Sequence, residues 1–339
     1  MKKDVAIVGA SGYTGIELTK ILSRHPHVNL RAVASQTNAG RTLSTIMGVG
    51  APDMKFCSIE SKLILKCDVI FSCLPHGAAA KHIVKWRKLG KIVFDLSADF
   101  RLKDKEQYKQ WYHLDHPAPH MLKDAVYGLP ELHREKIKKT SLVACPGCYT
   151  TATILGIMPA LKAGIISPDI FVSAVSGTSG AGKQAKHEYS YCEVNENLSA
   201  YALPNHRHTP EMEQELSLAC DHEALVSFVP HLGPFNRGIH ATITASLTAA
   251  TTQEKVTKIY RDFYASAAFV KISEKNPQLK DVVGTNFCLI RPIVDVRTGR
   301  LIALSVLDNL IKGASGQAVQ CFNIRFKYKE NEALDIGPC

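Results

Sequence analysis

Short apolar runs recur through the first half of the chain, and several are followed by segments whose apolar residues recur at helical spacing. Continuous hydrophobicity over so few residues is typical of strands that are buried on both faces of a parallel sheet. The runs lie at residues 5–8, 30–34, 69–73, 91–96 and 141–144, and the helical segments at residues 16–22, 78–89 and 151–161. This alternation predicts an α/β domain with a parallel sheet.

The pattern changes beyond the helical segment at 151–161. Strand-like runs lie at residues 170–175, 226–231, 239–245 and 288–292, with one helical segment at 211–219. These runs predict an α+β domain with an open, mostly antiparallel sheet. Residues 103–120 read as a polar, irregular connection. Residues 308–322 predict an amphipathic helix whose small residues permit close packing, and we expect it to return against the first domain.

A glycine-rich turn separates the first apolar run from the first helical segment. Its spacing, G-x-x-G-x-x-G, lets backbone N–H groups approach a pyrophosphate at a helix N-terminus. The strand before it and the helix after it make the signal for dinucleotide binding a strong one. A second glycine-rich loop at 176–183 offers further backbone groups to a ligand. The predicted cofactor-binding residues in the two loops are Gly9, Ser11, Gly12, Tyr13, Thr14, Gly15, Ser176 and Gly177.

The second apolar run indicates which dinucleotide binds. An NAD site usually has an acidic residue about 20 residues past the glycine turn, where its carboxylate accepts from the ribose 2′-hydroxyl. This chain has Ser35 after the run at 30–34, and Arg41 follows. No carboxylate repels a 2′-phosphate there, and an arginine is near enough to pair with one. These two residues favour NADP(H), whereas an ordinary polar loop is the alternative.

Cys148 lies at the end of a Pro-Gly turn, just ahead of the helical segment at 151–161. A thiol at a helix N-terminus faces the positive end of the macrodipole, which favours the thiolate. This position predicts a nucleophilic cysteine. A buried structural thiol is one alternative. Another is a Cys-x-x-Cys pair of Cys145 with Cys148, acting as a thiol–disulfide couple or as half of a zinc site.

Two histidines, His206 and His208, precede Glu211 at the start of the helical segment at 211–219. A thiol–imidazole pair generates thiolate and later moves protons, so this pair predicts the acid/base for Cys148. No third ligand lies nearby in the sequence, and we expect no metal; a surface histidine pair is the alternative. Arg101 follows the run at 91–96, at the carboxyl end of a predicted parallel strand, where ligands bind. It is a candidate anion clamp, and a surface ion pair with Asp104 is its other interpretation.

Composition narrows the class of protein further. The net charge is +10 at pH 7, but the basic residues are dispersed, which argues against nucleic-acid binding and for attraction of small anionic ligands. No apolar run is long enough for a membrane span, and the N-terminus lacks the apolar core of a signal peptide. The ten cysteines are scattered, as is typical of reduced thiols. We expect a cytoplasmic protein without a membrane partner.

Taken together, these segments resemble one known family, N-acetyl-γ-glutamyl-phosphate reductase, a relative of aspartate-semialdehyde dehydrogenase. The similarity covers essentially the whole chain, and its motifs occur in the family's order. Where the family usually reads Asn-Pro-Gly-Cys-Tyr-Pro-Thr, this chain has Cys145 for the Asn and Thr150 for the Pro. The segments that carry the resemblance are residues 9–15, 95–101, 127–131, 146–149, 176–183, 206–211 and 308–313.

The resemblance implies an NADPH-dependent reduction in arginine biosynthesis. Cys148 thiolate would attack the γ-acyl phosphate of the substrate, expel phosphate and leave a thioester that hydride then reduces. His206 would be the acid/base, with Glu211 orienting an imidazole and His208 as the alternative. The other implied roles are a hold on the phosphoryl group by Arg101, a substrate-side lining by Tyr149 and Lys183, and a place near the nicotinamide for Asn309.

The resulting domain prediction has a Rossmann-type NADP-binding domain at 1–147, completed by the segment 310–339, and a catalytic, dimerising α+β domain at 148–309. We expect a homo-oligomer, a dimer or a tetramer. Reduction of aspartyl phosphate, or of a carrier-linked aminoadipyl or glutamyl phosphate, is the nearest alternative activity. A non-catalytic NADP-binding sensor that switches through Cys145 and Cys148 is the alternative from another class of protein.

Overall fold

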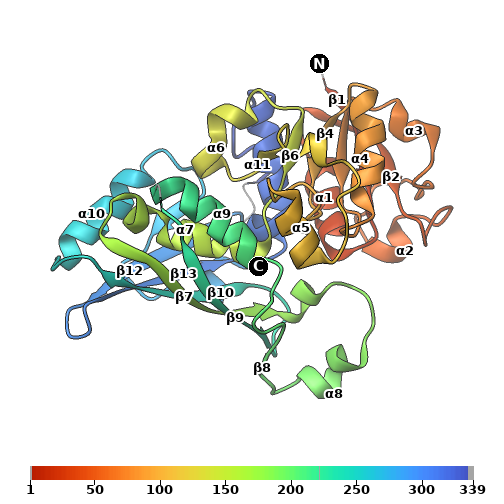
Figure 1. Ribbon diagram of the computed structural model, residues 1–339. Helices are drawn as coiled ribbons and strands as arrows, with labels where there is room; N and C mark the ends of the chain where they lie inside the picture. Colours follow the sequence, from red (N-terminus) through yellow and green to blue (C-terminus); the bar gives the residue numbers. More distant parts are fainter. Residues whose placement is uncertain (1, 221, 335–339) are drawn as a thin grey trace. The chain divides into compact units, whose positions relative to one another are not determined.

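The computed structural model describes residues 2–220 and 222–334. The chain forms two compact units (Figure 1). The first contains the residues up to Pro146 and returns at 314–334, and the second spans residues 147–313. The last five residues of the predicted segment 310–339 lie outside the described residues.

In the first unit, the described residues form a six-stranded sheet in the order β2-β1-β3-β4-β6-β5, and all of its strand pairs are parallel. Its strands are β1 (Lys3–Val8), β2 (Val28–Ala34), β3 (Val69–Ser72), β4 (Ile92–Asp95), β5 (Val126–Tyr127) and β6 (Leu142–Ala144). The central strands β1, β3 and β4 are almost entirely buried, as their unbroken hydrophobicity predicts. The chain reverses direction across the sheet between β1 and β3, which is where a doubly wound sheet binds its ligand.

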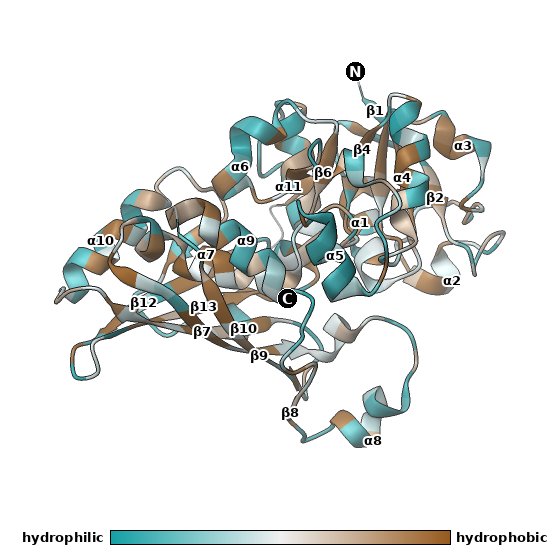
Figure 2. Cartoon of the chain, in the orientation of Figure 1, coloured by the Kyte–Doolittle hydropathy of each residue, from teal (hydrophilic) through white to brown (hydrophobic). Residues whose placement is uncertain are grey.

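Helices of the first unit follow its strands and cover the sheet. They are α1 (Tyr13–Ser23), α2 (Ser44–Met47), α3 (Lys62–Leu65), α4 (Ala79–Lys88), α5 (Lys105–Tyr112), the 3₁₀ turn η1 (Pro119–Met121), α6 (Pro130–Ile137) and α11 (Gly316–Arg325). Figure 2 shows the apolar strands of this unit beside the mostly hydrophilic α6. The ring of Phe322, on α11, packs against Phe71 and Phe94 of the sheet.

One expectation for the first unit is wrong, because helix α5 lies inside the stretch 103–120 that reads as irregular. Asp104 caps this helix by accepting the backbone N–H of Glu106. Tyr108 and Tyr112, one turn apart, are buried and stack on each other. With only two buried positions in eight residues, the apolar pattern is too sparse to stand out from a loop.

In the second unit, the described residues form a seven-stranded mixed sheet in the order β11-β12-β13-β10-β7-β9-β8. Four of its six strand pairs are antiparallel and two are parallel, which confirms the mostly antiparallel sheet. The strands β8, β11 and β13 were not expected from the sequence. The strands are β7 (Ile166–Gly177), β8 (Ser199–Ala200), β9 (Leu225–Gly233), β10 (Ile239–Leu247), β11 (Val270–Ile272), β12 (Cys288–Asp295) and β13 (Arg300–Leu307).

Three helices pack on one face of this sheet, and the other face carries no helix in Figure 1. They are α7 (Cys148–Lys162), α9 (Thr209–Cys220) and α10 (Gln253–Phe263). Residues 149–161 of α7 are all buried, so this helix is the core of the unit. It approaches the sheet so closely that a Cβ on Gly156 would lie 2.5 Å from Cδ1 of Ile243. This packing fixes where α7 begins.

Short turns complete the second unit. They are η2 (Thr178–Ala181), η3 (His187–Tyr189), α8 (Tyr191–Val194), η4 (Leu279–Asp281) and the π-helical turn η5 (Ile311–Ser315). The amphipathic helix predicted at 308–322 is therefore two structures: a π turn and then α11, which starts at Gly316. No helix in the described residues is long and apolar enough to cross a membrane.

Candidate active site

Cys148 is the first residue of α7, directly after the N-cap residue Gly147. Gly147 has extended backbone (φ −68°, ψ 152°), and its carbonyl accepts the first helical hydrogen bond, from Thr151. The Pro-Gly turn therefore ends where the helix begins. The thiol lies at the positive end of a helix of 15 residues and is half-buried. This environment stabilises the thiolate.

The residue before the thiol is held by α9. Oε2 of Glu211, which is fully buried, accepts the backbone N–H of Gly147 at 3.1 Å. The imidazole of His208 lies directly against Gly147, because a Cβ there would be only 2.4 Å from Nε2 of that ring. Two of the predicted catalytic side chains thus converge on the turn that presents Cys148. Glu211 contacts this turn through the Gly147 N–H, an interaction that the sequence did not suggest.

His206 has a different environment. Its Nδ1 accepts the backbone N–H of His208 at 3.1 Å, so the neutral ring carries its proton on Nε2. The ring packs edge-on against Tyr149, Tyr201 and Phe228. Burial, reinforced by the neighbouring His208, lowers the pKa of His206 to about 2. The imidazole of His206 is therefore neutral at physiological pH.

Tyr149 is buried beside this histidine pair. Its hydroxyl donates to the carbonyl of His231 at 2.8 Å and accepts from the hydroxyl of Tyr201 at 3.3 Å. Burial raises the pKa of Tyr149 well above its usual value, so the phenol stays protonated. A hydroxyl with both of these partners connects β9 to the start of α7.

Asn309 lies in a second cluster of the same unit. Its Oδ1 accepts the backbone N–H of Gly238 at 2.7 Å, and its Nδ2 donates to Oγ of Ser179 at 3.0 Å. Ser176 is buried, and its Oγ donates to the carbonyl of Gly177. Gly177 packs on the loop after β9, where a Cβ would lie 2.5 Å from the carbonyl oxygen of Asn236. The glycine-rich loop and Asn309 are thus brought together.

Lys183 is exposed and follows the turn η2 by two residues. The residues of this region that the sequence analysis missed are Ser179, Tyr201, Arg237, Asp308 and Gly313. Each makes its contact with a residue far away in the chain, as Arg237 does with Asp308. Asp308 lies in the segment 308–313 that carries the family resemblance, but nothing in the local pattern indicates that its side chain pairs with Arg237.

The predicted dinucleotide loop occupies the β1–α1 connection of the first unit. Gly9 has φ +85°, and a Cβ there would lie 2.5 Å from the carbonyl oxygen of Cys73. Gly15 is equally crowded against Ala10, whereas the space beside Gly12 is open. Two glycines therefore allow close packing and the third leaves room for a ligand. Tyr13 and Thr14 begin α1 and are partly exposed at the same turn.

Ser35 directly follows β2, and its side chain contacts this loop. Its Oγ lies 2.8 Å from Oγ of Ser11 and accepts the backbone N–H of Asn38. Nη1 of Arg41 donates to Oδ1 of Asn38 at 3.3 Å. The structure therefore brings together three of the residues predicted to bind the cofactor: Ser11, Ser35 and, through Asn38, Arg41. Gly12 has open space beside it at the start of α1, where no side chain caps the helix, as the binding of a pyrophosphate at a helix N-terminus requires.

Arg101 ends the turn after β4 and is only 7% exposed. Its Nη2 donates to the carbonyl of Leu96 at 3.0 Å, within its own turn. Burial raises the pKa of Asp95, at the end of β4, to about 7, although Ser97 donates two hydrogen bonds to it and Arg101 opposes the shift. The positive charge of Arg101 therefore acts on the buried carboxyl group of Asp95.

Asp99 stabilises the neighbouring turn after β3. Its carboxylate accepts the backbone N–H groups of Gly77 at 2.7 Å and of Ala80 at 2.9 Å, and the hydroxyl of Tyr108 at 3.0 Å. The N-cap residue of α4, Ala78, has no capping side chain of its own. Asp99 supplies that cap from the turn after β4.

Cys145 directly follows β6, and its side chain has an exposed fraction of 1%. Burial, together with Asp95, raises the pKa of its thiol far above the usual value, so this thiol is protonated. Cys145 and Cys148 are both free thiols. A protonated, buried sulfur is a poor partner for thiol–disulfide exchange.

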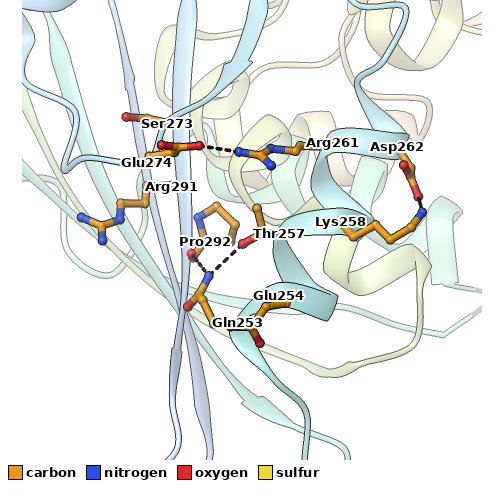
Figure 3. Close-up of a pocket in the computed structure, with 10 residues that line it drawn as sticks. All are labelled: Gln253, Glu254, Thr257, Lys258, Arg261, Asp262, Ser273, Glu274, Arg291 and Pro292. Atoms are coloured by element: carbon orange, nitrogen blue, oxygen red, sulfur yellow. Dashed lines mark hydrogen bonds and ion pairs between the residues drawn. The ribbon is translucent and has the colours of Figure 1, made fainter.

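One open pocket of about 480 Å³ lies between α10 and the strands β11 and β12 (Figure 3). Its charged groups interact with one another: Arg261 with Glu274 across the pocket, and Lys258 with Asp262 along the helix. Arg291 donates to Asn276. None of the residues that line the pocket belongs to the predicted site.

Comparison with protein families gives two matches that together cover most of the chain. The family described as semialdehyde dehydrogenase, NAD binding domain, matches residues 4–140. The family described as semialdehyde dehydrogenase, dimerisation domain, matches residues 148–309.

Similar proteins of known name fall into two groups. N-acetyl-gamma-glutamyl-phosphate reductase of Geotalea daltonii is 46% identical, over 98% of this chain and 97% of its own. The protein of the same name from Acetivibrio thermocellus is 42% identical, over 97% of each chain. Among solved structures, aspartate semialdehyde dehydrogenase II of Vibrio cholerae has a TM-score of 0.75 at 18% identity, covering 96% of this chain and 99% of its own. The Candida albicans aspartate semialdehyde dehydrogenase with NADP has a TM-score of 0.72 at 17% identity, covering 96% and 98%. The solved structures share the fold.

Proposed function

This chain belongs to the N-acetyl-γ-glutamyl-phosphate reductase family, and we propose that it reduces N-acetyl-γ-glutamyl phosphate to N-acetylglutamate 5-semialdehyde, with release of phosphate, in arginine biosynthesis. The observation that carries the proposal is the presentation of Cys148 at the first position of α7, with His208 against the residue before it. A thiolate at that position suits an acyl phosphate, which is electrophilic and has a good leaving group.

In the proposed reaction, the Cys148 sulfur attacks the acyl carbon, the C–O bond to phosphate breaks, and a thioester forms. When bound, the cofactor would supply the hydride that the thioester carbonyl carbon accepts. The oxygen of the resulting thiohemiacetal takes a proton from a neighbouring acid. The same group removes that proton as the C–S bond breaks, which releases the aldehyde and restores the thiolate.

We assign this proton transfer to His208, the alternative in the sequence analysis, in place of His206. The Nδ1 lone pair of His206 accepts a backbone N–H, and burial lowers the pKa of His206 to about 2. A ring in that state donates through Nε2 but does not readily accept a second proton. The His208 ring, against Gly147, is one residue from the nucleophile. Glu211 is proposed to hold the Gly147 turn in place beside the His208 ring.

NADPH is the proposed cofactor. The first unit belongs to a family of NAD-binding domains, and the choice of the phosphorylated form is supported by Ser35 and Arg41. Ser35 places a hydroxyl where an NAD site has a carboxylate, and Arg41 follows on the same loop. The residues proposed to hold the pyrophosphate are Ser11, Gly12, Tyr13 and Thr14.

The proposal includes a homodimer formed through the uncovered face of the second sheet. Phe171, Thr244 and Ile302 are direct neighbours in one row across three strands, and Ile293 continues the row. Phe171 is 45% exposed, a large exposed fraction for an apolar side chain on a strand. The family description of this unit as a dimerisation domain supports a second copy as the occupant. Light scattering of Phe171→Lys, with monomer as the expected species, tests it.

A cytoplasmic location is also proposed, supported by nine described cysteines that are all free thiols.

One assay tests the activity. With NADP⁺ and phosphate present, the enzyme should oxidise N-acetylglutamate semialdehyde, followed by absorbance of the reduced cofactor. Aspartate semialdehyde and unacetylated glutamate semialdehyde serve as competing substrates, because the structural relatives at 16–18% identity share the fold alone. A higher kcat/KM for either competitor would overturn the proposed substrate.

A further inference from the structure

Asp308 is a buried carboxylate of the second unit, and its partners are an arginine and the backbone. The side chain is fully buried, and its two oxygens accept Nε and Nη2 of Arg237 at 3.1 and 3.2 Å. This two-point pairing with a guanidinium compensates the cost of burying the charge. Oδ2 also accepts the backbone N–H of Gly284 at 2.8 Å. The side chain of Asp308 is therefore fixed in one orientation.

The same carboxylate holds the turn that follows it. Oδ1 of Asp308 accepts the backbone N–H groups of Leu310 at 2.8 Å and of Ile311 at 3.1 Å. The backbone carbonyl of Asp308 accepts the N–H of Gly313 at 2.9 Å. These bonds start the π turn η5, a geometry that is rare and often found at functional sites. The path of residues 310–313 is set by Asp308.

Gly313 lies directly against the nucleophile. A Cβ at this position would be 2.8 Å from Cβ of Cys148 and 3.3 Å from its Cα. A side chain at this position would therefore have to displace the turn or the cysteine. The backbone of residue 313 forms a wall on one side of Cys148.

We propose that Asp308 is a positioning residue for the nucleophile: it holds the 310–313 turn so that Gly313 confines the side chain of Cys148 at the start of α7. The inference goes beyond the proposed function and rests on it only in taking Cys148 as the nucleophile. It predicts that thiolate formation at Cys148 depends on a carboxylate that does not touch the sulfur.

The chemistry of position 308 requires a carboxylate. Oδ1 accepts three donors, one from Arg237 and two from the backbone, and Oδ2 accepts two, from Arg237 and Gly284. In Asp308→Asn, the amide NH₂ would face donors in either orientation. The variant keeps the size of the side chain and loses the hold on the turn.

The test is alkylation of the intact protein by iodoacetamide across a pH series, with the modified peptides resolved by mass spectrometry. It compares the wild type with Asp308→Asn and Gly313→Ala. The matched control is Asp295→Asn, because Asp295 also accepts two backbone N–H groups, from Arg297 and Thr298, in the β12–β13 turn. The exposed Cys192 is the internal reference thiol.

We expect the apparent pKa of Cys148 to rise in Asp308→Asn and in Gly313→Ala, and the alkylation rate at neutral pH to fall about ten-fold for each unit of this rise, because the thiolate is the nucleophile. Asp295→Asn and Cys192 should not change. If Asp308→Asn does not unfold cooperatively in urea, the variant is not folded, and the alkylation profile of Gly313→Ala then tests the proposal. An unchanged Cys148 profile in the folded variants would overturn the proposal. Because alkylation needs no substrate, this result stands apart from the assay of acyl-phosphate reduction.

Discussion

Gly147→Ala adds one methyl group to the turn that presents the nucleophile, at the position where the imidazole of His208 lies. The three nearest atoms to the new Cβ would all belong to that ring, at 2.4 to 2.6 Å. The backbone angles at Gly147 suit alanine, so the perturbation comes from contact and not from backbone strain. The substitution therefore tests whether the position of His208 matters for the reaction.

The size of the effect follows from these distances. Carbon atoms in contact are about 3.5 Å apart or more, so the ring has to move by roughly 1 Å. A misplacement of that size at a catalytic group costs on the order of a hundred-fold in rate. Overpacking costs about 1–3 kcal/mol of stability, offset by about 0.4–1 kcal/mol because alanine restricts the unfolded chain. We expect kcat to fall about a hundred-fold and the free energy of unfolding to fall by about 0–2.6 kcal/mol.

The assay is the initial rate of cofactor reduction with the semialdehyde and phosphate, together with urea unfolding followed by circular dichroism. His208→Ala is the matched background, since it leaves space for the methyl group. In that background, Gly147→Ala should no longer destabilise the protein and should reduce the rate little further. A kcat for Gly147→Ala within two-fold of wild type would refute the assignment of proton transfer to His208.

Substitutions at the two thiols, the cofactor loop and His206 give three further predictions. Cys148→Ser should abolish turnover and retain cofactor binding by fluorescence titration, because the serine oxygen is not activated, whereas Cys145→Ser should keep most activity; an indispensable Cys145 would contradict its protonated, buried state. Arg41→Ala should lower kcat/KM for NADPH about ten- to a hundred-fold, the value of a charge-assisted bond of roughly 1.5–3 kcal/mol, and leave NADH unaffected; an equal loss for both cofactors would count against the 2′-phosphate contact. His206 has its pKa lowered from 6.5 to about 2, so between these values the unfolded chain binds a proton there that the folded chain does not. Stability should therefore fall as the pH drops below about 6.5, and His206→Asn should flatten this loss in urea unfolding at pH 7 and pH 5; equal slopes would contradict the buried neutral ring.

Elements with a strong periodic signal could be predicted from the sequence. The central strands of the first unit are buried on both faces. Such burial requires an unbroken run of apolar residues, and a run of this kind is visible in the sequence. The Pro-Gly turn and the apolar segment after it placed Cys148 near a helix start, and the helix begins at that residue. For these strands and for the start of α7, the residues that set the local structure are also the ones that pack in the fold, so the sequence pattern was sufficient.

The remainder depends on contacts between distant parts of the chain. Nothing near Asp308 in the sequence indicates that Arg237 pairs with it, 71 positions away. The side chain of Asn309 faces Gly238 and Ser179, so its local motif does not tell what it binds. The choice between His206 and His208 required the hydrogen bond to Nδ1, which a sequence cannot contain.

Asp99 has a consequence for where an anion can bind in the first unit. Both α1 and α4 begin at the carboxyl edge of the parallel sheet, after the adjacent strands β1 and β3. Each helix start carries partial positive charge. At α4, the Asp99 carboxylate already accepts the backbone N–H groups of Gly77 and Ala80. The protein's own carboxylate therefore takes the place that an anion would occupy at this helix start. At α1, within the described residues, no side chain caps Gly12 and no acidic residue lies in the first turn. Of these two neighbouring helix starts, the one at α1 stays open to an anion, so we expect a bound pyrophosphate at the β1–α1 turn and not at α4.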